Sequence, residues 1–108
     1  MATISLNIYK EDNKKEIEKT YSVEGYELML GTVEDFMSVI DIDKLGDNRE
    51  AAKMLLKCYK QLTPLLLDIF PDVTEEELKR VKVNELIETF KQVGAAIIDG
   101  FGFLKQGN

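Results

Sequence analysis

The chain has 108 residues, of which 44% are hydrophobic and 31% charged, and its 20 acidic and 14 basic residues give a net charge of −6. This length fits one domain, and the composition excludes low-complexity disorder. The acidic balance argues against nucleic acid as a partner, because phosphates would be repelled. Apolar runs fall far short of the ~20 residues that a membrane-spanning helix needs, so we expect a soluble protein without a membrane partner.

The cysteine and histidine content argues against thiol chemistry. Cys58 is the single cysteine, so no intrachain disulfide can form, and the chain contains no histidine to act as its base. The stretch "MATISLNIYK" at the start alternates polar and apolar residues, unlike a secretory signal peptide. These features predict an inert structural cysteine in a reducing cytoplasm.

The first 24 residues predict a β-hairpin. Residues 3–9 alternate, with Ile4, Leu6 and Ile8 on one face, the period of a half-buried strand. A second alternation places Ile17, Tyr21, Val23 and the aliphatic stem of Lys19 on one face. The polar segment 10–16 between the two runs reads as the loop. Two strands are marginal alone, so their apolar face must pack on helices.

A first helix is predicted after Thr32, which we expect to cap the segment "VEDFMSVI". Phe36, Met37 and Ile40 would form its inner stripe. The following "DIDKLGDN" resembles an EF-hand loop at Asp41, Asp43 and Gly46, but Leu45 and Ala52 stand where two oxygen ligands are needed. We therefore interpret this segment as a turn between helices, without a metal.

Apolar residues recur at three- and four-residue steps from Arg49 to Phe70, which predicts a long central helix. Pro64 lies inside it and predicts a kink or break after Leu62. Pro71 would end this helix.

Two helix starts follow within about a dozen residues. Thr74 and Glu77 have the spacing of a capping box, which predicts a short helix through Arg80. Asn84 is expected to begin the last helix, since Val81 and Val83 weaken continuation of the short one. The apolar stripe of the last helix comprises Leu86, Ile87, Phe90, Val93, Ile97 and Ile98.

The predicted fold is α+β, with an N-terminal β-hairpin packed on a small bundle of four to five helices. A single domain spans residues 1–108, divided into a hairpin (1–24), a helical part (32–99) and a flexible tail (100–108). The residues expected in the core are Leu55, Leu62, Leu66, Phe70, Leu86, Phe90 and Ile97.

Neither the acids nor the glycines indicate catalysis or a cofactor. The acidic pairs stand at helix starts, where they interact favourably with the helix dipole, and no glycine precedes a Lys-Ser/Thr pair as in phosphate-binding loops. The ending "AAIIDGFGFLKQGN" is more informative. Its apolar residues Ile98, Phe101, Phe103 and Leu104 either complete the core or form a docking surface for another chain.

The segment "LLLDIFPDVTEEELKRVKVNELIETFKQVGAAI" resembles the tail assembly chaperones of long-tailed bacteriophages of the siphophage type. That family has a phrase of the form FP-x-hydrophobic-T-x-E-E-L, a short spacer, then hydrophobic-x-E-L and an amphipathic helix. The likeness covers mainly residues 65–98, and the N-terminal hairpin agrees in type.

The resemblance implies a non-enzymatic protein of the host cytoplasm that coats and solubilises the tape-measure protein and helps recruit tail-tube subunits. It also implies self-association, and in some members a longer form made by ribosomal frameshifting. The partner-binding residues would be Ile98, Phe101, Phe103 and Leu104. A small adaptor or regulatory domain that binds a single partner helix is the alternative, and the two differ in the number of copies bound per partner.

Overall fold

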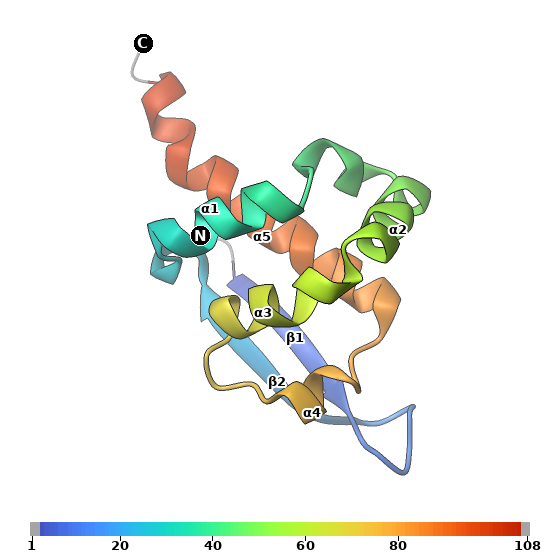
Figure 1. The fold of residues 1–108 in the computed structure, drawn as a ribbon. Helices are drawn as coiled ribbons and strands as arrows, with labels where there is room; N and C mark the ends of the chain where they lie inside the picture. The colour runs from blue at the N-terminus through green and yellow to red at the C-terminus, as the bar shows by residue number, and fades with distance from the viewer. Residues whose placement is uncertain (1–2, 107–108) are drawn as a thin grey trace.

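A two-stranded hairpin opens the fold and helices follow to its end (Figure 1). The computed structural model describes residues 3–106, with side chains through residue 100. The elements are β1 (Thr3–Tyr9), β2 (Ile17–Glu24), the 3-10 helix η1 (Gly25–Glu27), α1 (Leu30–Val39), the 3-10 helix η2 (Ile42–Gly46), α2 (Asn48–Lys57), α3 (Tyr59–Ile69), α4 (Glu75–Leu78) and α5 (Val83–Gln106). The predicted α+β class, a hairpin packed on five α-helices, is confirmed.

The predicted hairpin forms, but Ile17, which was expected on its apolar face, is 48% exposed because the register shifts between Ile8 and Tyr9. The strands are antiparallel, with Ile4 opposite Val23 and Leu6 opposite Tyr21, and Ile4, Leu6 and Ile8 are buried. The outer edge of β1 is covered by α5, where Gln92 Oε1 accepts from the Ser5 amide at 2.8 Å and Thr89 Oγ1 donates to the Ser5 carbonyl at 2.7 Å. Helix α5 therefore satisfies polar backbone groups that an open strand edge would expose.

One cluster of buried apolar side chains joins the hairpin to the helices. Its largest members are Phe36, Phe70 and Phe90, and the rings of Phe36 and Phe90 lie 5.8 Å apart in a tilted arrangement. Five of the seven predicted core residues are buried, namely Leu55, Leu66, Phe70, Phe90 and Ile97. Leu62 and Leu86 also pack against the cluster, but their side chains are only partly buried.

Helix α1 begins earlier than predicted. Its N-cap is Met29, whose carbonyl accepts from the Val33 amide at 3.0 Å, because the extended backbone ends there. Thr32 is consequently a buried residue inside the helix and not its cap. Met37 is also misassigned, since it is 52% exposed while Phe36 and Ile40 form the inner face.

The central helix is two helices, and the break lies at Cys58 instead of after Leu62. The Cys58 amide donates to Met54 to finish α2, while its carbonyl accepts from Gln61 in the first turn of α3. Pro64 then sits inside α3, where it removes one helical hydrogen bond without ending the helix. The change of direction at Cys58 allows α2 and α3 to bury Leu55 and Leu66 in the same core.

The restart between α4 and α5 is confirmed, with small shifts of boundary. Helix α4 ends at Leu78, and α5 begins at Val83, one residue before Asn84, with the Lys82 carbonyl accepting from Glu85 and Leu86. Helix α5 continues to Gln106 and so passes residue 99, the predicted end of the helical part. No glycine among residues 3–106 has a positive φ. Gly100 stays helical although glycine inside a helix is about 1 kcal/mol less favourable than alanine.

Candidate partner-binding surface

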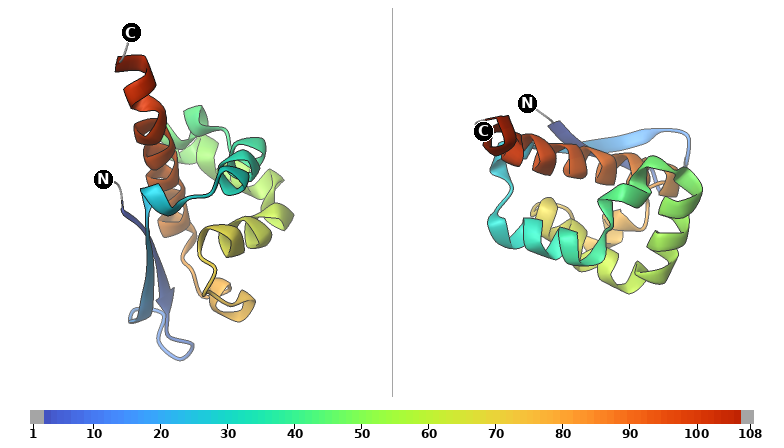
Figure 2. Two further views of the ribbon diagram at one scale, coloured as in Figure 1. Left: turned by 90° about the vertical axis from the view of Figure 1, so that its left-hand side faces the viewer. Right: turned by 90° about the horizontal axis from the view of Figure 1, so that it is seen from above.

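Helices α1 and α5 face each other across the helical body at the end of the molecule from which α5 extends (Figure 2), and Phe36 of α1 meets Phe90 of α5 between them. The molecule measures 53 × 26 × 22 Å along its principal axes. Within the body α5 contacts β1, η1 and η2, while α1 packs mainly on α3. On the outer sides of α1 and of α5 up to residue 100, Leu30, Met37 and Ile98 remain more than half exposed.

Large exposed apolar side chains gather at this end. Nine such residues occur in the part of the chain whose side chains the structure describes, and five of them, Tyr26, Met29, Leu30, Met37 and Ile98, belong to η1, α1, α5 or the link between η1 and α1. We call Tyr26, Leu30, Val33, Met37 and Ile98 the α1–α5 surface. Contiguous apolar exposure of this kind is typical of protein interaction sites, whereas single exposed apolar residues are ordinary.

The helical period explains why both helices present an apolar outer side. In α1, Leu30, Val33 and Met37 follow each other at steps of three and four, so they share one face beside the buried stripe of Phe36 and Ile40. The apolar arc of α1 is thus wider than the core can cover. In α5, Ile97 is 8% exposed and Ile98 is 55% exposed, because consecutive helical residues point about 100° apart.

Two open hollows separate α1 from the end of α5. One, of about 290 Å³, is lined by Tyr26, Leu30 and Val33 with Ile97 and Gly100 of α5. The other, of about 540 Å³, is lined by Met37, Ile42 and Ile98 with Asp41 and Asp43. Both hollows have apolar walls open to solvent, which suits a partner's side chains better than an enclosed small molecule.

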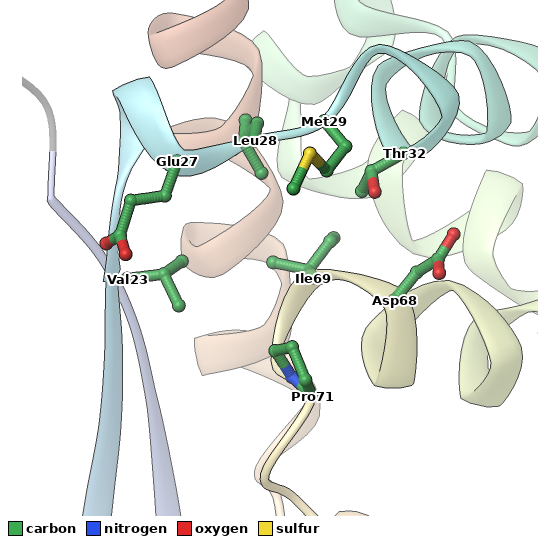
Figure 3. A pocket seen from close by; sticks show the side chains of 8 residues that line it. All are labelled: Val23, Glu27, Leu28, Met29, Thr32, Asp68, Ile69 and Pro71. Atoms are coloured by element: carbon green, nitrogen blue, oxygen red, sulfur yellow. The ribbon is translucent and has the colours of Figure 1, made fainter.

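A third hollow, of about 170 Å³, continues the same end of the molecule and shares Leu28 with the first (Figure 3). Ile69 and Pro71 form one side and Met29 and Thr32 the other, with Glu27 and Asp68 at its margins. The pKa of Asp68 is raised, mainly by its hydrogen bond with Asp35 and in part by burial and charge repulsion. Two carboxylates therefore meet where α1 packs on α3.

The opposite end, at the hairpin loop and α4, is held by polar contacts. Glu77 is 7% exposed and completes the predicted capping box with Thr74, accepting also from Tyr21 Oη at 2.7 Å and from Lys19 Nζ at 3.1 Å. The hydrogen bond from Tyr21, helped by Thr74 and Lys19, lowers the pKa of Glu77 to about 2 although burial opposes this. Arg80 similarly joins the carbonyl of Tyr9 to two glutamates, Glu18 and Glu76.

The predicted partner-binding residues are only partly placed by the structure. Ile98 lies in the α1–α5 surface, next to Met37 in the larger hollow. Phe101, Phe103 and Leu104 belong to α5 by their backbone, and their side chains lie outside the described residues. Sequence reasoning missed Tyr26, Leu30 and Met37, although the apolar run "LML" at 28–30, between a strand and a helix, was a usable signal.

The described residues offer no arrangement suited to a metal or to thiol catalysis. No three His, Cys, Asp or Glu side chains converge at metal-binding distance within the part of the chain that was placed. Burial raises the pKa of the Cys58 thiol, which disfavours the reactive thiolate. Along residues 3–106, no helix combines the length and apolar character required to span a bilayer.

Comparison with known proteins yields no relative: no protein-family model, curated protein or solved structure matches the chain. The fold and the surface define a small α+β domain with one largely apolar end and one polar end.

Proposed function

We propose that the protein is a tail assembly chaperone of a long-tailed bacteriophage, which binds the tape-measure protein through the α1–α5 surface. The observation that carries this proposal is the gathering of Tyr26, Leu30, Met37 and Ile98 around two open hollows beside the extending end of α5. The sequence resemblance over residues 65–98 supplies the kind of partner. In this function the protein needs no catalytic group or cofactor.

The physical task explains why such a surface is useful. A tape-measure protein is long and largely helical, and its apolar stripes would aggregate if they stayed exposed. Shallow apolar hollows that receive side chains from one face of a helix give weak contacts, and many copies along one chain add up to stable coverage. The net charge of −6 would keep the coated complex soluble until tail-tube subunits displace the chaperone.

Co-expression with a tape-measure protein, followed by light scattering on the soluble fraction, tests this function. We expect a soluble complex whose mass corresponds to many copies of this chain per tape-measure protein. One copy per binding site would instead support the single-helix adaptor. If the tape-measure protein stayed insoluble and this chain eluted alone, the result would contradict the proposed chaperone function.

A pair of double variants tests whether the α1–α5 surface is the contact. Leu30→Asp with Ile98→Asp places charges on the surface, and we expect the soluble complex to be lost while circular dichroism remains unchanged. Leu56→Asp with Tyr59→Asp is the matched control, since these two residues are at least as exposed on average as Leu30 and Ile98 but lie on α2 and α3. Equal loss in both variants would show that general apolar exposure, not this surface, makes the complex.

A further inference from the structure

The three hollows at the apolar end carry acidic groups and no basic ones. Glu27 and Asp68 line the hollow of Figure 3, and Asp41 and Asp43 line the hollow beside Ile98. The residues lining the three hollows include no lysine or arginine.

Five of the fourteen basic residues line a hollow at the opposite end. A hollow of about 290 Å³ at the hairpin loop and the α4–α5 link is lined by Lys10, Lys14, Lys79, Arg80 and Lys82. Two of these already have acidic partners, since Lys10 pairs with Glu16 and Arg80 with Glu18 and Glu76. The hollow at the hairpin end and the three hollows at the apolar end therefore differ in the charge of the residues that line them.

We infer that the α1–α5 surface recognises a helical segment of a partner protein in which lysine or arginine side chains flank an apolar stripe. This inference rests on the proposed function and adds the chemistry of the partner's segment. Apolar side chains of the segment occupy the two hollows against Leu30, Met37 and Ile98. Basic side chains on either side of the stripe then reach Asp41 and Asp43 at one margin and Glu27 and Asp68 at the other.

Charge and distance favour this occupant over a neutral or acidic one. Glutamates beside the stripe would stand against four carboxylates with no cation among the lining residues, and like charges at close range cost binding energy. Lysine and arginine also bring long apolar stems that extend the contact with the hollow walls. Screening acts over about 8 Å at physiological salt, so the acids that line the three hollows contribute most to the preference. Lys60 lines a neighbouring hollow together with Asp68 and opposes the preference at that margin, whereas no basic residue lines the hollow that holds Asp41 and Asp43.

Two synthetic amphipathic peptides of about 18 residues, or about five helical turns, test the inference. Both carry the same leucine stripe, and the flanking positions hold lysine in one and glutamate in the other. Fluorescence anisotropy measures their binding to the full-length protein at about 50 mM and about 300 mM NaCl. We expect the lysine peptide to bind about tenfold more tightly at low salt, and the preference to shrink at high salt.

The variant Asp41→Asn with Asp43→Asn gives the matched comparison. Asparagine keeps the shape and the capping hydrogen bond that Asp41 accepts from the Asp43 amide, so the fold should persist. We expect the variant, which keeps Glu27 and Asp68, to lose about half of the free-energy preference for lysine while still binding the leucine stripe. Equal binding of the two peptides by the unmodified protein would overturn the charge preference and leave apolar docking intact. Binding of neither peptide would overturn the docking surface itself, and with it the basis of the proposed function.

Discussion

The two ends of this molecule are built on different principles. At the hairpin end, polar groups from distant parts of the sequence meet: Tyr21 and Lys19 of β2 reach Glu77 of α4, and Arg80 reaches Tyr9 of β1. At the other end, α1 and α5 leave apolar side chains such as Met37 and Ile98 exposed around open hollows. One end adds polar contacts between the hairpin and the helices, and the other exposes apolar side chains among the residues whose side chains the structure describes.

The difference between buried and exposed apolar residues can be tested most clearly within α5, which has both a core face and an exposed face. Phe90→Ala removes a fully buried ring that packs on Phe36, and we expect it to lower the free energy of unfolding by about 3–5 kcal/mol. Ile98→Ala should change it by less than about 0.5 kcal/mol. Urea unfolding followed by circular dichroism measures both, and a large loss for Ile98→Ala would show that its side chain belongs to the core.

The polar end is tested by Glu77→Ala. This change removes the acid of the capping box and the carboxylate that accepts from the Tyr21 hydroxyl, so we expect a loss of about 2–3 kcal/mol in the free energy of unfolding. Glu75→Ala is the control, because Glu75 is exposed in the same turn and should cost less than about 0.5 kcal/mol. Similar losses in the two variants would mean that any alanine substitution in helix α4 lowers the free energy of unfolding, and that the contacts of Glu77 are not the cause.

Acid should weaken the same contacts. The pKa of Glu77 is about 2 in the folded protein and near 4.5 when unperturbed, so between these values the unfolded chain binds more protons than the folded one. The contribution of Glu77 is therefore fully present above about pH 4.5 and is lost as the pH falls toward 2. Urea midpoints measured from pH 6 to pH 2 should fall less steeply in Glu77→Ala than in the unmodified protein, and parallel curves would contradict this assignment.

The smallest expected effect lies at the apolar end. The pKa of Asp68 is raised beside Asp35, so the folded state favours the protonated form and the pair is less favourable once both groups are charged. Asp68→Asn should therefore raise stability at neutral pH by up to about 0.5 kcal/mol, since Asp68 is exposed and solvent weakens the repulsion. The gain should disappear at low pH, where the aspartate is itself protonated. A loss of stability at neutral pH would show that the carboxylate has a favourable contact.

The sequence predicted local features well and long-range ones poorly. Residues 3–9 and the Thr74–Glu77 capping box depend on neighbours in the chain, and both formed as expected. The break at Cys58 and the start of α1 at Leu30 depend on how helices share one core, which no local pattern specifies. The α1–α5 surface was not predicted for the same reason. The helical period gives the face on which Met37 lies, but it does not tell whether another helix covers that face.

The methionines permit the most direct test of the docking surface. Met37 is 52% exposed in the α1–α5 surface and Met29 is 73% exposed beside it, while Met54 is 9% exposed within the core. Methyl NMR of methionine-labelled protein, recorded with and without a co-purified tape-measure protein, reports on all three positions. We predict that the Met37 and Met29 signals shift or broaden on binding and that Met54 stays unchanged. Unchanged Met37 and Met29 signals in a complex that does form would place the contact elsewhere and contradict the account.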